Sequence, residues 1–196
     1  YIGTFKYGLR HGTGMLLNKF GRVKYNKDVK WINGKVIGDG DITDFYENGA
    51  IKYIGKYNND MYNGKGILYY NSGLDNINLS YKKYEGQFKN NNYEGKGKLY
   101  YSIEELSFFN NIKDNNNSKY NHIKYEGQFK NNNYHGKGVL KFPNNKICYD
   151  GNFYNNFINE KNEIIIYYND GHPLYKGFIL FYSLFVWFVK IIISLS

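Results

Sequence analysis

The residue types in this chain that could do chemistry are paired glycines, four histidines and a single cysteine. A phosphate-binding loop would need a Gly-x-Gly pair to precede Lys-Ser/Thr or to open a helix. No pair in this chain does so, and the pairs recur in register, so we interpret them as packing positions. The pairs are Gly12/Gly14, Gly38/Gly40, Gly64/Gly66, Gly95/Gly97 and Gly136/Gly138.

The histidines and the cysteine do not combine into a predicted catalytic or metal site. His11 and His135 occupy one repeat position four units apart, a separation of roughly 40 Å at two strands per unit. Cys148 is the only cysteine, so no intramolecular disulfide or Cys-based metal site can form, and a reducing compartment is the default. We therefore predict no catalytic residue, no metal ligand, no cofactor and no enzyme activity within residues 1–196.

Two long, nearly identical segments show that these residues belong to an internal repeat. Tyr84 to Leu99 reads YEGQFKNNNYEGKGKL, and Tyr125 to Leu140, 41 positions further along, reads YEGQFKNNNYHGKGVL. Self-similarity of this kind indicates units that bury their hydrophobic faces against one another, in place of one globular core.

Each copy is expected to form a β-hairpin of roughly 18 to 20 residues. Tyr84, Gly86 and Phe88 alternate with polar residues, which is typical of a half-buried strand, and an Asn-rich turn and a second alternating strand follow. Regular glycines in a strand indicate the close approach of something large. We expect aromatic rings of the same or the next hairpin to fill the hollows above these glycines.

The pattern resembles the MORN repeat (membrane occupation and recognition nexus), in which Tyr-x-Gly-x-Phe/Trp is followed by a turn and by Gly-x-Gly-x-Leu/Ile/Val. The resemblance implies an all-β fold, with stacked β-hairpins forming one elongated, twisted antiparallel sheet, followed here by a C-terminal hydrophobic segment. The positions that carry the resemblance, which we expect to be structural, are Tyr1, Gly3, Phe5, Gly12, Gly14, Tyr53, Gly55, Tyr57, Gly64, Gly66, Tyr84, Gly86, Phe88, Gly95, Gly97, Tyr125, Gly127, Phe129, Gly136, Gly138, Tyr149, Gly151 and Phe153.

Six repeat units are expected, and two of them depart from the pattern. The second is degenerate because Lys27 and Val29 stand at the Tyr and Gly positions, although Trp31 keeps the aromatic one. The sixth has Glu160 and Asn162 in place of its paired glycines, so we expect it to cap the array. Residues 74–80 are expected to form a linker, and residues 102–123 an Asn-rich insert loop with one helical turn over 103–109. The units lie near residues 1–21, 27–49, 53–73, 84–101, 125–142 and 149–171.

The C-terminal segment, residues 178–196, differs in kind from the repeats. After Tyr175 opens a seventh unit that stays unfinished, residues 178–195 read FILFYSLFVWFVKIIISL, with Lys190 as the one charge. As a helix this stretch would be about 27 Å long, just short of a hydrocarbon core. Three interpretations stay open: a C-terminal membrane anchor, a cap over the open end of the sheet, or the translation of an unspliced AT-rich intron.

Positive charge is concentrated at repeat positions. The formal net charge is +9, which favours anionic partners. Lys65, Lys96 and Lys137 share one repeat position, and Lys89 and Lys130 share another, so each set should form a column on the polar face. Two interpretations stay open: contact with the anionic headgroups of an acidic membrane surface, or a solvated face that keeps the array soluble. Because the aromatic residues alternate onto the packed face, we expect no nucleic-acid binding.

The function that the resemblance implies is a non-catalytic scaffold or adaptor. MORN-type modules link membranes to cytoskeletal or signalling protein partners, often as homodimers, which would place the chain in the cytoplasm at a membrane or at the cytoskeleton. One alternative stays open. The chain could be the regulatory region of a larger enzyme, such as a phosphatidylinositol-phosphate kinase or a lysine methyltransferase, with the catalytic domain outside residues 1–196.

Overall fold

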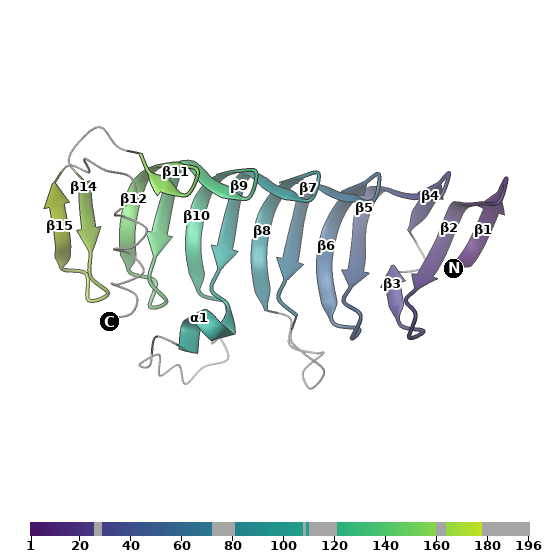
Figure 1. Ribbon diagram of the computed structural model, residues 1–196, viewed down its shortest axis with the longest axis horizontal. Coiled ribbons are helices and arrows are strands. Elements are labelled where there is room, and N and C mark those ends of the chain that lie inside the picture. Colours follow the sequence, from purple (N-terminus) through teal and green to yellow (C-terminus); the bar gives the residue numbers. More distant parts are fainter. Residues whose placement is uncertain (26–28, 72–80, 108, 110–120, 160–163, 178–196) are drawn as a thin grey trace. The chain divides into compact units, whose positions relative to one another are not determined.

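The computed structural model describes residues 1–25, 29–71, 81–107, 109, 121–159 and 164–177. Strands make up most of these residues, which fall into two compact units, 1–92 and 93–196. Figure 1 shows the strands of each unit lying side by side, and sequential strands pair antiparallel. The prediction of an all-β fold built from stacked β-hairpins is therefore confirmed.

The first unit is an antiparallel sheet whose strands follow the order of the sequence. The exception is that β3 and β4 both lie between β2 and β5, each pairing with one part of these longer strands. The strands are β1 (Ile2–Lys6), β2 (Leu9–Leu17), β3 (Val23–Tyr25), β4 (Lys30–Ile32), β5 (Lys35–Phe45), β6 (Ile51–Asn58), β7 (Met61–Tyr69) and β8 (Lys82–Lys89).

The second unit repeats this arrangement, with β9 to β13 paired in sequence order and with β14 and β15 forming a separate two-stranded sheet. Tyr175, which opens the unfinished seventh unit of the sequence, lies in β15 opposite Ile166. The elements are β9 (Asn92–Tyr100), α1 (Ile103–Ser107), β10 (Ile123–Lys130), β11 (Asn133–Lys141), β12 (Ile147–Tyr154), β13 (Phe157–Ile158), β14 (Ile164–Tyr167) and β15 (Pro173–Gly177).

Two-residue turns close the hairpins. Asn131 and Asn132 join β10 to β11 with φ angles of +49° and +68°, and Asn59 and Asp60 join β6 to β7 with +49° and +62°. Positive φ at both central residues is the type I′ geometry that matches the right-handed twist of paired strands, and Asn tolerates it better than most residues. The Asn-rich segments of the sequence therefore set the hairpin register.

Tyrosine rings cover paired glycines, as expected from the sequence. Gly127 and Gly138 lie opposite each other in β10 and β11, and a Cβ added at Gly138 would overlap the ring of Tyr125. In the first unit, a Cβ added at Gly66 would overlap the ring of Tyr53 in the same way. Glycine is thus required because the ring occupies the space of a side chain.

The two glycines of a Gly-x-Gly pair have different roles, which corrects the expectation that both face the packed side. Gly136 has a φ of +59° and lies where the β10–β11 register shifts between Gly127 and Gln128. This shift is a β-bulge, and a left-handed bulge residue favours glycine. The three atoms nearest to a side chain added at Gly136 all belong to Gln128, whereas those nearest to one at Gly138 belong to the Tyr125 ring and hydroxyl. Gly136 is needed for its backbone conformation, whereas Gly138 is needed for space.

The insert between β9 and β10 begins with α1. Ser102 and Glu105 form a capping box, in which the Glu105 amide donates to Ser102 Oγ (3.1 Å) and the Ser102 amide donates to Glu105 Oε2 (2.9 Å). At the far end, the Tyr101 amide donates to the His122 carbonyl (3.0 Å), and β10 already begins at Ile123. Both ends of the insert are therefore joined to the sheet.

Several segments that the sequence singled out lie outside the described residues. They are the linker 74–80, most of the insert (108 and 110–120), Glu160 and Asn162 of the sixth unit, Lys27, and the hydrophobic segment 178–196. Within the part of the chain that the structure does describe, no helix combines the length and the apolar character needed to cross a membrane.

Candidate interaction surface

A row of aromatic rings forms the buried side of each unit. In the second unit, the rings of Tyr125 and Tyr134 stack with their centroids 3.9 Å apart, and Phe153 meets Tyr125 edge-on at 5.2 Å. In the first unit, Tyr53 and Tyr62 stack at 3.8 Å in the same manner. Such pairs contribute roughly 0.5–1.5 kcal/mol each beyond the area that they bury. These rings are committed to packing, which leaves the opposite face for contacts with partners.

The aromatic residues expected to be structural are buried in every repeat except the first, where Tyr1 is half-buried and Phe5 is exposed. Tyr53, Tyr84 and Tyr125 are 0% exposed, and Tyr149 is 2% exposed. Phe5 occupies the same repeat position as the buried Phe88 and Phe129 but is 61% exposed in β1. The aromatic row is therefore incomplete at Phe5.

Sequence reasoning missed why the aromatic residue that opens each regular repeat of this chain is tyrosine and not phenylalanine. The Tyr125 hydroxyl donates to the Gln128 carbonyl at 3.0 Å, and the Tyr53 hydroxyl donates to the Lys56 carbonyl at 2.8 Å. Both carbonyls lie beside the bulge, where the regular ladder of backbone hydrogen bonds is interrupted. Burial raises the pKa of Tyr125 to about 12, so its hydroxyl stays a donor at neutral pH.

Sequence reasoning also missed a link between neighbouring hairpins. The side chain of the second turn residue reaches back to the preceding hairpin: Asn156 Oδ1 accepts a hydrogen bond from the Tyr134 amide at 2.8 Å. The Asn156 amide in turn donates to the Tyr134 carbonyl at 3.0 Å. The recurrence of Asn or Asp at this position was the available signal. The other examples are Val36 with Asp60, Tyr62 with Asn91, and Tyr93 with Asn132.

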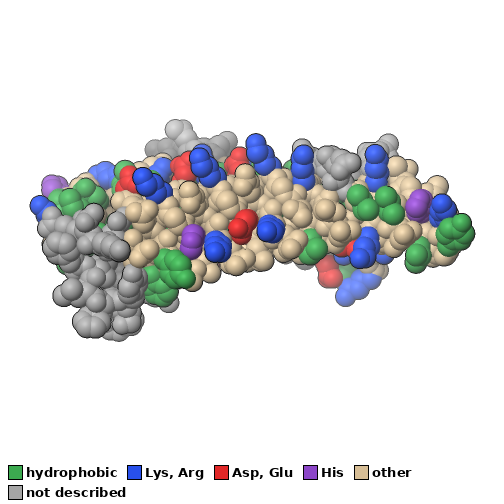
Figure 2. All heavy atoms as spheres, turned by 90° about the horizontal axis from the view of Figure 1, so that it is seen from above, with side chains coloured by type: hydrophobic (Ala, Val, Ile, Leu, Met, Phe, Trp, Pro, Cys, Tyr) green, Lys and Arg blue, Asp and Glu red, His purple; other side chains and the backbone are tan. Residues whose placement is uncertain are grey.

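The lysines at the two repeat positions are exposed and carry unpaired charge. None of them has an acidic partner within the described part of the chain, in contrast to Lys98 and Lys141, which lie 3.3 Å and 3.5 Å from the carboxylate of Glu126. Figure 2 shows Lys and Arg side chains recurring over the face seen from above, with acidic side chains beside some of them. The exposed, unpaired lysines are Lys65, Lys89, Lys96, Lys130 and Lys137.

The strand register fixes where two of these lysines lie in the second unit. Lys96 pairs with Gln128, and Lys137 pairs with Asn152. Lys96 and Lys137 are thus carried by β9 and β11, which flank β10, and strands two apart are roughly 10 Å from each other. Positive charges at this spacing can each contact a separate anionic group on a flat surface.

The residue types that could support catalysis are dispersed. Cys148 lies in β12 with 5% of its surface exposed, and burial raises its pKa to about 12, which disfavours the reactive thiolate. Groups of three or more His, Cys, Asp and Glu side chains close enough to hold a metal ion do not occur among the described residues. The Gly-x-Gly pairs lie inside strands, so none of them opens a helix.

Comparison with known proteins identifies the hairpins. The family model described as MORN repeat matches residues 1–17, 53–74, 84–103 and 125–147. These segments begin at Tyr1, Tyr53, Tyr84 and Tyr125, the tyrosines that open the expected units. No curated protein matches the chain.

Proposed function

Because this chain belongs to the MORN-repeat family, we propose that it is a non-catalytic scaffold that binds acidic membrane surfaces and protein partners through the polar face of its hairpins. The observation that carries this proposal is the set of exposed lysines without acidic partners. Lys96, Lys130 and Lys137 belong to this set in the second unit. A lysine that is already ion-paired has less to gain at an anionic surface, whereas each unpaired lysine contributes about 1 kcal/mol there.

Protein partners, including cytoskeletal proteins and a second copy of the chain, form the other half of the proposal. Exposed apolar residues on the second unit support it, since Ile147 is 42% and Tyr154 is 54% exposed. Aromatic residues are enriched in protein interfaces because they bury a large area at low entropic cost. Association with membranes or the cytoskeleton would place the protein in the cytoplasm.

The test is co-sedimentation with vesicles that contain an acidic phospholipid, compared with neutral vesicles, at low and high salt. The triple variant K96Q/K130Q/K137Q should bind acidic vesicles about 100-fold more weakly, since three contacts of about 1 kcal/mol are lost. The matched control K98Q/K124Q/K141Q removes the same charge from lysines that are paired with Glu126 or Glu105, and it should bind nearly as well as the parent.

Comparing residues 1–177 with residues 1–196 separates the contribution of the C-terminal segment. Binding by both chains that high salt abolishes supports a lysine-mediated contact. Salt-independent binding by 1–196 alone would assign the contact to residues 178–196 and contradict the lysine proposal. If neither chain sediments with vesicles, the membrane half of the proposal fails, and pull-down of protein partners tests the remaining half.

A further inference from the structure

A groove in the first unit lies beside the degenerate second repeat, which contributes Trp31 to its lining. Val36 stands at the repeat position that Tyr62 and Tyr134 occupy in the regular hairpins, so one stacked ring is missing. A groove of about 600 Å³ lies in this part of the unit, and Trp31, Tyr25 and Tyr62 contribute to its lining. This volume falls within the usual range for small-molecule sites.

Four aromatic residues contribute to the walls of the groove, and hydrogen bonds and ring contacts hold them in place. Trp31 is almost fully buried, and its indole N–H donates to the Gly14 carbonyl at 2.9 Å. The Tyr25 ring meets Trp31 at 5.9 Å and Tyr57 at 5.8 Å, and the two tyrosine hydroxyls lie 3.0 Å apart. Burial raises the pKa of Tyr25, so its hydroxyl remains protonated. The rings along the groove are therefore preformed, and each keeps only a small part of its surface exposed.

A buried carboxylate in the groove has an unused oxygen. The Asp44 side chain is only 4% exposed, and its Oδ2 accepts from the Tyr62 hydroxyl at 2.8 Å, with Lys52 Nζ 3.7 Å away. Asp44 Oδ1 has no hydrogen-bond partner among the described residues. A buried acceptor without a partner is costly, and a ligand N–H group would satisfy it.

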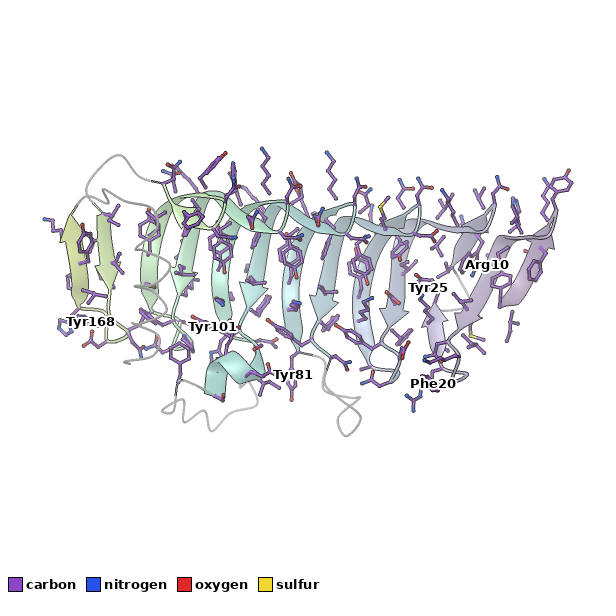
Figure 3. All side chains as sticks on the ribbon, in the orientation of Figure 1. Arg10, Phe20, Tyr25, Tyr81, Tyr101 and Tyr168 are labelled. Carbon is purple, nitrogen blue, oxygen red and sulfur yellow. The ribbon has the colours of Figure 1, made fainter. Side chains whose placement is uncertain are left out.

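A cation without an acidic partner lines the same groove. The Arg10 guanidinium lies 4.3 Å from the centre of the Trp31 ring, and it forms no ion pair within the described part of the chain. Stacking uses the flat face of the guanidinium and leaves its N–H edge for an anion, and bidentate contact with a phosphate suits that edge. Arg10 stands at the repeat position of Tyr62. In Figure 3, the labelled Arg10 and Tyr25 lie over the part of the sheet between β2 and β5.

The strand register places the Asp44 carboxylate and the Arg10 guanidinium at different positions along the strands. Tyr25 pairs with both Leu16 and Asp44, whereas Trp31 pairs with Gly12, four residues away from Leu16 along β2. At the usual rise, four residues span roughly 13 Å. Asp44 therefore lies toward one end of the groove, and the Arg10–Trp31 stack lies toward the other.

We propose that this groove binds a purine nucleoside phosphate. The base lies against the rings of Tyr25 and Tyr57, one of its N–H groups donates to Asp44 Oδ1, and its phosphate lies at Arg10. Two parts of the ligand meet a feature that the protein leaves open: the base meets the unused acceptor of Asp44, and the phosphate meets the unpaired cation of Arg10. The groove is lined by three cationic side chains, Arg10, Lys24 and Lys52, and by the two carboxylates of Asp44 and Asp60, so one positive charge is left in excess and an anionic ligand fits better than a cationic one. This binding site is separate from the lysine columns and does not depend on the scaffold proposal.

Calorimetric titration of the whole chain with AMP and GMP tests the proposal. The parent should bind the nucleotides more tightly than adenosine, and more tightly than inorganic phosphate. Arg10→Gln should remove the preference for AMP over adenosine, and Asp44→Asn should weaken binding about 10- to 100-fold, as expected when a hydrogen bond to a charged group is lost. AMP with two methyl groups on N6 lacks the N–H donors of adenine and should bind as weakly to the parent as AMP binds to Asp44→Asn.

Arg22→Gln is the matched control, since Arg22 is an exposed arginine of the same unit that does not line the groove. It should leave nucleotide binding unchanged. Equal weakening of nucleotide binding by Arg22→Gln and Arg10→Gln would overturn the proposal and indicate non-specific electrostatic attraction.

Two results with the parent protein would also overturn the proposal: no binding of AMP or GMP at millimolar concentration, or tighter binding of an acidic peptide. Thermal melting of each variant shows whether a loss of binding reflects unfolding, and Asp44→Glu offers a second test if Asp44→Asn unfolds.

Discussion

The ring of Tyr125 lies against the ring of Tyr134, with centroids 3.9 Å apart and planes inclined by 11°. The two residues come from the paired strands β10 and β11, and the glycine pair Gly127 and Gly138 lies beneath the Tyr125 ring. A hairpin of this kind has little side-chain volume of its own beneath the tyrosine. Its core is a tyrosine stack placed directly on backbone, which explains why both tyrosine and glycine recur at fixed positions.

Substituting Gly138 by valine should destabilise the second unit. The new side chain would occupy the space of the Tyr125 ring, and overpacking of a filled core costs about 1–3 kcal/mol or more. The measurement is the free energy of unfolding from urea titration followed by circular dichroism. Lys137→Val is the control, because it places the same side chain on the adjacent exposed position. Gly97→Val should destabilise the unit in the same way, because Gly97 has the same place in its own repeat. Equal stability of Gly138→Val and the parent would contradict this account of the core.

Replacing Tyr125 by phenylalanine should cost about 1 kcal/mol of unfolding free energy while leaving the ring stack in place. The loss arises because the Gln128 carbonyl beside the bulge no longer accepts the hydroxyl at 3.0 Å. Tyr154→Phe is the control, since Tyr154 is 54% exposed, and it should change stability by no more than about 0.5 kcal/mol. If the two variants are equally stable, the hydroxyl has no role in holding the bulge.

The hairpins themselves could be predicted from the sequence, and the reason is local. Tyr84, Gly86 and Phe88 alternate with polar residues, and Asn tolerates the positive φ of a two-residue turn, so pattern and turn chemistry agree. The bulge at Gly136 could not be predicted in this way. A bulge changes which face of the sheet a residue occupies, but the sequence pattern of a bulged strand can be the same as that of a regular strand. Gly-x-Gly therefore looks like the ordinary alternation of inward-facing and outward-facing residues.

The groove of the first unit could not be predicted from the sequence pattern either. Asp44 and Tyr25 are opposite each other only because β3 pairs with β5, and this pairing follows from the irregular second repeat. The sequence did show that this repeat is degenerate at Lys27 and Val29. It could not show which side chains would surround the space that results, because they come from distant positions such as Arg10.

The link between neighbouring hairpins predicts a difference between two substitutions at one position. Asn156→Gly keeps a residue that accepts the positive φ of 71° but removes the side-chain acceptor for the Tyr134 amide, so it should cost about 1 kcal/mol. Asn156→Ala loses both features and should cost about 1 kcal/mol more, because alanine is strained in the left-handed region. Urea titration again measures both values. Equal stability of the glycine variant and the parent would show that the turn geometry alone matters and that the link does not contribute.

Burial of Cys148 predicts a dependence of both reactivity and stability on pH. Burial raises the pKa of the Cys148 thiol to about 12 in the folded chain, whereas the pKa of a cysteine in an unfolded chain is about 8.5. At pH 8, alkylation by iodoacetamide should therefore be many-fold slower in the folded protein than in urea, where the thiolate forms and is accessible.

The same pKa shift makes the free energy of unfolding depend on pH. Because the pKa of Cys148 is higher in the folded chain than in the unfolded chain, the contribution of the buried thiol to stability is complete below about pH 8.5 and is lost as the pH rises toward 12. By pH 10 the loss should reach about 2 kcal/mol in the parent, and Cys148→Ser should show a correspondingly smaller fall between pH 7 and pH 10. Equal alkylation rates in the folded and unfolded chains would mean that Cys148 is open to solvent and would contradict the packing of β12.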